Sequence, residues 1–272
     1  MTDAGSLAAL TGRAVASVRE TGGQHGVRHL TLVFADGQAA FAKVGPGSGG
    51  FVAEANGLRW LASADAVPVP EVLGVDETAL VISMVPAGGP PSPAEAFRFG
   101  SDLARLHLAG AASFGAPWPG CIASLPLDNT QGDSWPRWYA ERRLLPFVDQ
   151  ADAPAVHAVI DRIEDLAGPA EPPARIHGDC WSGNVLWSGG RGWLIDPAAH
   201  GGHRETDLTM LALFGAPQLD AILAGYQDVA PLAPGWQARI PLHQLHPLLV
   251  HARLFGPSYQ RAVTAAARAL LQ

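Results

Sequence analysis

The sequence predicts an α+β protein of two lobes, with a small β-rich N-terminal lobe that carries one main helix and a larger, mostly helical C-terminal lobe. The first observation behind this prediction is a pair of strand-like runs, residues 27–34 and 38–44. Asp36 and Gly37 lie between them and favour a hairpin, because both central positions of a tight turn need positive φ. The N-terminal lobe is therefore expected to contain an antiparallel sheet.

A proline- and glycine-rich segment separates the two predicted lobes. Residues 86–93 read PAGGPPSP, a composition typical of a linker. From Thr206 to the end of the chain the hydrophobic pattern is helical. We therefore expect an N-terminal lobe at residues 1–88 and a C-terminal lobe at residues 89–272, with a cleft between them.

Length and composition exclude several classes of protein. With 272 residues and 48% hydrophobic side chains, the chain can bury a sizeable core and is not disordered. A formal net charge of -7 argues against a broad basic surface for nucleic acid. Cys121 and Cys180 are too few for a disulfide framework, the first residues lack the basic start of a secretory signal, and no apolar run approaches the ~18–20 residues of a membrane span. We expect a monomeric, cytoplasmic protein that binds neither nucleic acid nor membranes.

The other elements of the N-terminal lobe follow from periodicity and turn signals. An amphipathic pattern predicts a first helix within residues 1–20, and residues 21–26 (TGGQHG) predict a glycine-rich turn before the first strand. Residues 51–63 should form the main helix of the lobe, and residues 79–85 a short buried strand.

The C-terminal lobe opens with a clear helix start. Ser92 suits the N-cap, Pro93 suits the first helical position, and Glu95 completes a capping box. Gly110 can end this helix. Residues 111–134 have no regular pattern, whereas helices are expected at 138–148 and 156–167, and short strands at 185–187 and 193–195.

A polar loop at residues 177–184 carries the first catalytic signal. Phosphoryl transfer needs a carboxylate that accepts the proton of the attacking hydroxyl, and oxygen ligands for Mg²⁺. Asp179 and Asn184 have the spacing of the base and a metal ligand in kinases, and Asp196 supplies a second metal ligand at a strand end. His177 is expected to buttress the loop rather than to react. The alternative is that these side chains only cap turns.

The N-terminal lobe offers an independent test of a kinase. Lys43, the only lysine of the chain, lies in the second strand of the hairpin, where kinases keep a lysine on the nucleotide phosphates. Glu54 lies on the apolar face of the next helix, together with Phe51 and Leu58. It should therefore point inward and pair with Lys43, because an unpaired buried charge is costly. The alternative for Glu54 is a solvated position at the rim of that face.

Backbone groups near the predicted turn and strand could complete a nucleotide site. Gly22 and Gly23 would let backbone N–H groups approach the phosphates. Met84 and Val85 follow the buried strand at the junction of the lobes, where an adenine could bond to the main chain. An ordinary turn and an ordinary strand end are the alternatives.

Four segments together resemble the fructosamine kinase (ketosamine 3-kinase) family. They are HGDCWSGN at 177–184, IDPA at 195–198, GHRETDLTML at 202–211 and EANGLRWL at 54–61. The resemblance covers roughly residues 20–260. It implies a protein-kinase-like fold, ATP and Mg²⁺ as cofactors, and phosphorylation of the 3-hydroxyl of a sugar attached through an amine as a 1-amino-2-ketose. That step makes the adduct labile, so that glycated amines are repaired.

The roles implied by this resemblance follow the matching positions. Asp179 would be the base, Asn184 and Asp196 the metal ligands, and Lys43 the phosphate contact. The family often has a redox-linked cysteine in its glycine-rich loop, but the corresponding region of this chain has none. Cys180 replaces the usual leucine beside the base, where a small apolar filler is expected.

The substrate side is implied by the same segments. Trp181 would line the sugar pocket, and a plain core tryptophan is an equal alternative. His203, Arg204 and Glu205 would contact the substrate or pin the loop. Asp207 would hold the backbone of the catalytic loop.

Two other functions stay open at this point. An aminoglycoside- or choline-type phosphotransferase would share the core motif. A catalytically inactive nucleotide-binding protein is disfavoured, because such a protein would typically lack one member of the predicted set, which is Lys43, Glu54, Asp179, Asn184 and Asp196.

Overall fold

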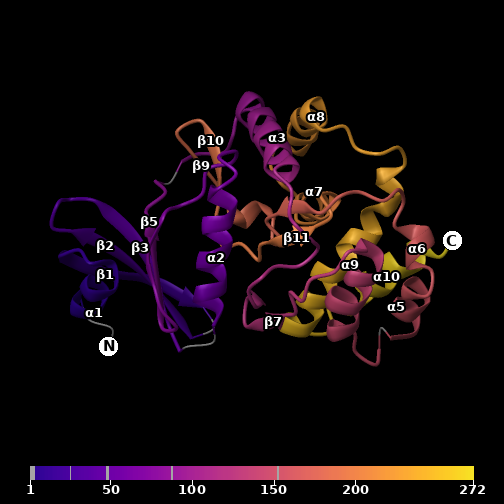
Figure 1. Ribbon diagram of the computed structural model, residues 1–272, viewed down its shortest axis with the longest axis horizontal. Helices are drawn as coiled ribbons and strands as arrows, with labels where there is room; N and C mark the ends of the chain where they lie inside the picture. The colour runs from indigo at the N-terminus through magenta and orange to yellow at the C-terminus, as the bar shows by residue number, and fades with distance from the viewer. Residues whose placement is uncertain (1–3, 25, 47–48, 87, 152) are drawn as a thin grey trace.

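A β-rich N-terminal lobe lies beside a larger helical lobe in the computed structural model, which describes all residues except 1–3, 25, 47–48, 87 and 152 (Figure 1). The predicted α+β architecture of two lobes is confirmed. The predicted linker lies between the last strand of the N-terminal sheet and the first helix of the C-terminal lobe, and a boundary near residue 88 stays a prediction.

The N-terminal lobe is built on a five-stranded antiparallel sheet of order β1-β2-β3-β5-β4. The predicted hairpin is present, but Gly37 has a positive φ of 85° and Asp36 does not, so the turn is longer than the two-residue type that was expected. The strands are β1 (Val15–Gln24), β2 (Val27–Phe34), β3 (Ala39–Val44), β4 (Val72–Val75) and β5 (Ala79–Ser83).

The predicted helix within residues 1–20 is wrong beyond Thr11. Helix α1 (Ala4–Thr11) is short, and β1 begins at Val15. Val15 and Val18 both pack against the core of the sheet, because an irregularity of register between Val15 and Ser17 brings residues three apart to one face. That spacing imitates helical periodicity in the sequence.

Helix α2 (Gly50–Ala62) covers one face of the sheet, close to the predicted 51–63. Phe51, Ala55 and Leu58 are buried on its inner face against Leu80 and Ile82 of β5. Burial of such apolar side chains contributes about 1.5–3 kcal/mol each, which fixes the helix on the sheet. The inward face predicted from periodicity is confirmed.

The C-terminal lobe begins with α3 (Pro93–Leu108), whose predicted capping box between Ser92 and Glu95 is confirmed. The predicted strands of the catalytic region are also confirmed as β9 (Val185–Ser188) and β10 (Arg191–Leu194), which pair with each other. The expected helix at 138–148 is instead divided into α4 (Trp135–Tyr139), a π-helical turn (Ala140–Leu144) and a 3₁₀ turn (Leu145–Phe147), with Pro146 in the last of these.

Two pairs of short strands were not predicted, since three-residue strands carry too little pattern to detect. They are β6 with β7, within the segment expected to be irregular, and β8 with β11. No helix among the described residues is long and apolar enough to cross a membrane. The remaining elements are β6 (Gly120–Ile122), β7 (Leu125–Leu127), α4 (Trp135–Tyr139), the turns Ala140–Leu144 and Leu145–Phe147, α5 (Ala153–Ile160), α6 (Ile163–Leu166), β8 (Ala174–Ile176), β11 (His200–Gly202), α7 (Glu205–Leu213), α8 (Leu219–Val229), α9 (Trp236–Phe255) and α10 (Gln260–Leu270).

Candidate active site

Lys43 of β3 joins the two lobes through its ammonium group. Its Nζ lies 2.9 Å from both carboxylate oxygens of Glu54 on α2 and 2.7 Å from Oδ1 of Asp196, which follows β10. The predicted ion pair of Lys43 and Glu54 is therefore confirmed. The contact with Asp196 is an additional link that the sequence did not reveal.

The position of α2 depends on its close approach to the chain that follows Asp196. A Cβ atom on Gly57 would meet the side chains of Pro197 and Ala199 at 3.2 Å, so a larger residue would push α2 away. Asp196 has a positive φ of 54°, a conformation that aspartate adopts more readily than most residues. Both features hold the carboxylates of the two lobes close to one ammonium group.

The electrostatics of this bridge keep Lys43 charged. Burial acts to lower the pKa of Lys43, but the carboxylates of Glu54 and Asp196 outweigh burial and raise the pKa to about 12. A permanent cation at this position is suited to hold the phosphates of a nucleotide.

Asp179 lies in the loop between β8 and β9, where Asn184 and His177 fix it. Asn184 Nδ2 donates to Asp179 Oδ2 at 2.8 Å and to the backbone oxygen of Asp179 at 2.9 Å. His177 is fully buried; its Nδ1 accepts from the Asp179 N–H at 3.2 Å, so that Nε2 donates to Ile195 O at 2.9 Å. These contacts give His177 the buttressing position expected of it.

Asp207 holds the backbone of the same loop from the first turn of α7. Its buried carboxylate accepts from the His177 N–H at 2.7 Å and from the Gly178 N–H at 2.9 Å. His107 Nε2 lies 3.1 Å from the same carboxylate, and Tyr226 orients the other ring nitrogen of His107 at 2.8 Å. The contacts expected of Asp207 are present. His107 and Tyr226 were not foreseen, because His107 lies 100 residues from Asp207 and 119 residues from Tyr226 in the chain.

The surroundings of Asp179 suit a proton acceptor near neutral pH. Burial raises the pKa of Asp179 to about 7; the hydrogen bond from Asn184 opposes this, while the charges of Asp196 and Asp207 add to it. A base whose pKa lies near the working pH can accept a proton in the reaction and release it afterwards.

The oxygen atoms at this site fit a magnesium ion. Asn184 uses its amide nitrogen to bind Asp179, which leaves its Oδ1 as an acceptor on the same side chain. The side chain of Asp196 is 40% exposed, so its carboxylate is accessible to solvent. Amide and carboxylate oxygens are the ligands that Mg²⁺ prefers, and these two residues are the ones that would hold it.

The four residues predicted to contact the nucleotide through their backbone lie in two parts of the N-terminal lobe. Gly22 and Gly23 belong to β1, paired with His29 and Arg28, so the prediction that they form a turn is wrong. They lie just before the hairpin tip, of which His25 lies outside the described residues. Met84 and Val85 follow β5, as expected.

Trp181 lies two residues after Asp179 and is 38% exposed, so it is not a core tryptophan. Its ring lies over Gly183, where a Cβ atom would come within 2.2 Å of the indole. It meets Phe214, just beyond α7, edge-on with 5.9 Å between ring centroids. Its position beside the base agrees with a substrate contact. Cys180, by contrast, is fully buried in the core, and burial raises the pKa of its thiol.

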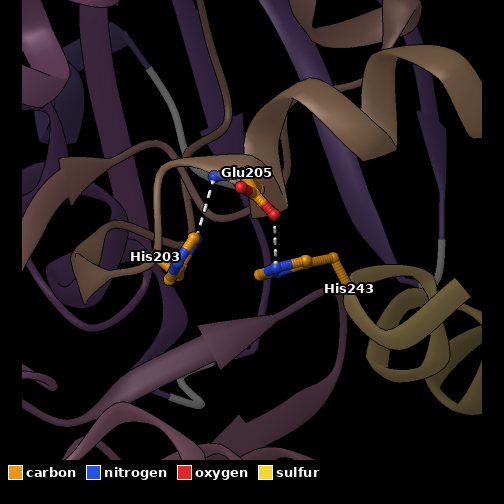
Figure 2. A group of neighbouring side chains, drawn as sticks. All are labelled: His203, Glu205 and His243. Carbon is orange, nitrogen blue, oxygen red and sulfur yellow. Dashed lines mark hydrogen bonds and ion pairs between the residues drawn. The ribbon is translucent and has the colours of Figure 1, made fainter. Parts of the chain in front are cut away.

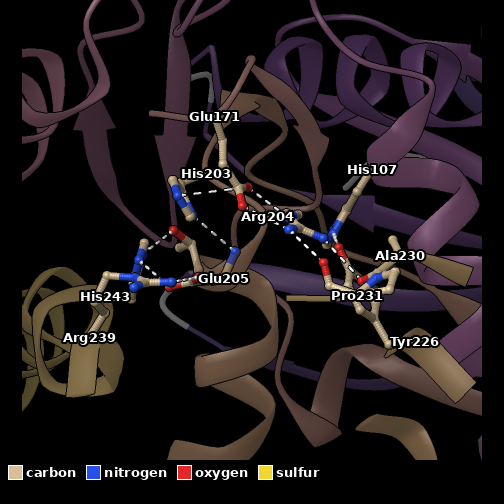
Figure 3. Close-up of polar contacts among 11 residues, drawn as sticks. His107, Glu171, His203, Arg204, Glu205, Tyr226, Ala230, Pro231, Arg239 and His243 are labelled. Atoms are coloured by element: carbon tan, nitrogen blue, oxygen red, sulfur yellow. Dashed lines mark hydrogen bonds and ion pairs between the residues drawn. The ribbon is translucent and has the colours of Figure 1, made fainter. Parts of the chain in front are cut away.

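The prediction that Glu205 contacts the substrate does not agree with the structure. Glu205 is fully buried, and His243 Nε2 lies 3.2 Å from it, although the ring is not aligned for a hydrogen bond (Figure 2). Arg239 of α9 donates to both carboxylate oxygens of Glu205, one at 2.9 Å (Figure 3). These contacts support the other role expected of Glu205, which is to hold the loop in place.

His203 and Arg204 belong to the same buried network. His203 is 3% exposed and accepts from the Glu205 N–H at 3.2 Å, so it is hidden from solvent. Arg204 binds both carboxylate oxygens of Glu171 at 2.6 and 2.7 Å and the carbonyls of Ala230 and Pro231 (Figure 3). The sequence could not reveal these partners, because none of them lies near the motif.

The cluster of His203, Glu205 and His243 has the residue types of a metal site. Their ligand atoms lie within 4.8 Å of one another. The guanidinium of Arg239 nevertheless occupies the carboxylate of Glu205, and a cation would be repelled there. We therefore assign this cluster as an ionic network that fixes α7 to α9.

Comparisons with known proteins agree with this geometry. Residues 8–272 match a family model described as fructosamine kinase. Proteins named probable ketoamine kinase from Synechocystis and Escherichia coli K12 are 35% and 34% identical to the chain; the alignments cover 78% and 76% of this chain and 75% and 76% of the relatives. A crystal structure of a fructosamine-3-kinase candidate from Thermobifida fusca has a TM-score of 0.95 and 50% identity, covering 98% of each chain.

Proposed function

The chain belongs to the fructosamine kinase family and is thus a phosphotransferase that acts on a hydroxyl group; from this premise we propose that it transfers the γ-phosphoryl group of ATP to the 3-hydroxyl of a ketosamine. A ketosamine is a 1-amino-2-ketose, the adduct left when a sugar has reacted with an amine. Phosphorylation at the 3-position makes the adduct labile, and the amine is released. The proposed role is therefore repair of glycated amines.

The observation that carries this proposal is the bridge made by Lys43. One ammonium group contacts Glu54 of the N-terminal lobe and Asp196 of the C-terminal lobe, beside a loop that presents Asp179. Phosphoryl transfer is mostly a matter of positioning and charge stabilisation, so these groups have to meet in the cleft. A protein that only bound nucleotide would not need an aligned carboxylate base.

Each residue of the site has a defined task in the proposed reaction. Lys43 would hold the phosphates, and Asp179 would accept the proton of the sugar hydroxyl at its free carboxylate oxygen. Asn184 would keep Asp179 in place while Asn184 and Asp196 hold the metal. When bound, Mg²⁺ supplies positive charge that offsets the charge of the phosphates.

The acceptor is the part of the proposal that the fold does not decide. Structures of a macrolide 2'-phosphotransferase and of a choline kinase share the fold, with TM-scores of 0.61 and 0.63 and 17% and 16% identity. Such likeness shows the fold alone. The preference for ketosamines rests on family membership and on Trp181, whose exposed ring can cover a sugar.

A panel assay tests the proposal. ADP release is measured with ATP and Mg²⁺ on fructosyl- and ribulosyl-lysine, an aminoglycoside and choline. We expect turnover of the ketosamines, and a loss of about 10²–10⁴-fold in kcat for Asp179→Asn. Asp161→Asn, an exposed aspartate of the C-terminal lobe, is the matched control and should leave kcat unchanged. Turnover of the aminoglycoside or choline without turnover of any ketosamine would contradict the proposal.

A further inference from the structure

A continuous row of aromatic rings leads away from the catalytic loop. It begins at Trp181 and passes to Phe214, with 5.9 Å between ring centroids, and from Phe214 to His251 of α9, with 4.8 Å. His251 in turn lies 5.4 Å from Phe255 and 5.0 Å from Tyr259. We call these five residues the aromatic row. None of Phe214, His251, Phe255 and Tyr259 has a part in the site described above.

The two ends of the row are open to solvent. Six large hydrophobic side chains are exposed among the described residues, and two of them belong to the row: Trp181 at 38% and Phe255 at 50%. Phe214, His251 and Tyr259, between and beside them, are partly buried. Apolar surface that is exposed to water is unfavourable, and contiguous patches of it mark binding surfaces. The row therefore has the character of a ligand surface rather than of a core.

The middle of the row is held rigid by a hydrogen bond. His251 Nδ1 lies 2.7 Å from Pro247 O and donates to it, so the ring cannot turn freely. Burial lowers the pKa of His251, which keeps the ring uncharged near neutral pH. A neutral, fixed ring can stack against a ligand and does not repel a cation.

The chemistry of a ketosamine determines which part of it can reach this row. The amine nitrogen is bonded to C1, two carbons from the C3 whose hydroxyl must lie at Asp179. The substituent on nitrogen therefore leaves the sugar close to the catalytic loop, where Trp181 stands. The nitrogen is a secondary amine, which is protonated at neutral pH and attracted to the face of an indole.

We propose that the aromatic row binds the substituent on the amine nitrogen, so that the enzyme prefers ketosamines whose amine carries a large apolar or aromatic group. This inference rests on the proposed function and names its substrate class more closely. The rings supply mainly apolar area and π faces, and their side-chain polar atoms other than the occupied Nδ1 of His251 are limited to one each on Trp181, His251 and Tyr259. A small amine would reach Trp181 and leave the rest of the row uncovered.

Two ketosamines with the same sugar test the proposal, one formed from methylamine and one from 6-phenylhexylamine, whose flexible arm is long enough to carry its ring past Trp181 and Phe214 toward Phe255. We expect kcat/KM to be about tenfold higher for the phenylhexyl adduct, the size of effect that an aromatic contact gives. Phe255→Ala should remove this advantage by raising KM for the phenylhexyl adduct, with kcat and the methyl adduct unchanged. Phe255→Tyr should keep the advantage.

The matched control is Phe97→Ala, which removes another exposed phenylalanine, 41% exposed on α3. This variant should leave kcat/KM unchanged for both adducts. Thermal unfolding of each variant separates folding from binding, and Phe255 is exposed enough to be truncated without a large cavity.

The outcomes distinguish this inference from the proposed function. Equal kcat/KM for both adducts in the wild-type protein, or an equal loss for both in Phe255→Ala, overturns the role of the aromatic row and leaves the kinase intact. If neither adduct is turned over, the proposed function fails, and the inference that rests on it fails too.

Discussion

Two groups of charged side chains flank the catalytic loop, and they differ in how much water reaches them. In the first group, the side chains of Lys43, Glu54 and Asp196 are 11%, 12% and 40% exposed. In the second group, the side chains of Glu205 and Arg239 are 0% and 8% exposed. Both groups consist of ion pairs at hydrogen-bond distance, yet the first can exchange its partners for a ligand and the second cannot.

The difference shows how one residue type serves chemistry or support according to its surroundings. Burial alone would raise the pKa of Glu205, but the contacts with His243 and Arg239 outweigh burial and lower it to about 2. Asp179, with one amide donor and two carboxylates nearby, has a pKa raised to about 7. A carboxylate whose partners outweigh its burial stabilises the fold, whereas one whose partners do not is ready to take up a proton.

The largest expected effect comes from breaking the buried group. Glu205→Gln leaves Arg239 without its anion, so we expect the free energy of unfolding to fall by about 3–5 kcal/mol in denaturant titrations at pH 7. The stability given by Glu205 is present above its unfolded pKa of 4.5 and is lost as pH falls toward its folded pKa of about 2, so the difference should shrink in that range.

The exposed pair of Arg137 and Glu141 is the control for this prediction. Glu141→Gln should change the free energy of unfolding by less than about 0.5 kcal/mol. If the two substitutions had similar effects, burial would not be what separates the groups.

The second effect concerns Lys43 and is measured in activity, with thermal unfolding to show that the variant is folded, because the substitution also leaves the buried Glu54 without its cation. Lys43→Met is expected to lower kcat/KM by about 10²–10³-fold, because a fixed charge on the transferring phosphate is lost. Lys43→Arg tests geometry, since it keeps the charge but changes its shape. Normal turnover by the Lys43→Met variant would show that Lys43 has no role in catalysis.

A smaller effect is the pH dependence set by Asp179. The base acts in its ionised form, so kcat/KM should rise with pH and level off above about 7, the pKa of Asp179. Below that pH, each unit should lower kcat/KM about tenfold. A profile that is flat between pH 5 and 8 would show that Asp179 is not the titrating base.

The smallest effect has the opposite sign to that of Glu205. The folded pKa of Asp179 is raised from 3.8 to about 7, so this carboxyl lowers the stability progressively as pH rises from 3.8 to about 7, and by its full amount above pH 7. Asp179→Asn should therefore raise the melting temperature at pH 8 more than at pH 5. An unchanged or lower melting temperature at pH 8 would place Asp179 with the supporting carboxylates.

The catalytic groups could be predicted from the sequence because their signals are local. Asp179 and Asn184 lie in one loop. The helical spacing of Glu54 from Phe51 and Leu58 predicts that its side chain points inward. The helix α2 and the hairpin of β2 and β3 likewise follow from patterns within about a dozen residues. Hence the ion pair of Lys43 and Glu54 was predicted from the sequence, but the contact of Lys43 with Asp196 was not.

The supporting groups could not be predicted, since their partners lie far away in the chain. The sequence predicts that Glu205 contacts the substrate, because its partner Arg239 lies on α9, far from the motif. His107 supports Asp207 from α3 in the same way. In β1, an irregular register made Val15 and Val18 look helical. Each failure concerns a contact or a distortion that leaves no periodic trace.

The single lysine of the chain has a consequence for the durability of the protein. Sugars modify proteins when an unprotonated amine attacks the carbonyl carbon of the sugar, and lysine side chains are the usual targets. Here the only ε-amine lies between two carboxylates, with a pKa of about 12, and is largely hidden from solvent. A protein that is proposed to act on sugar adducts thus offers reactive sugars almost no side-chain amine of its own.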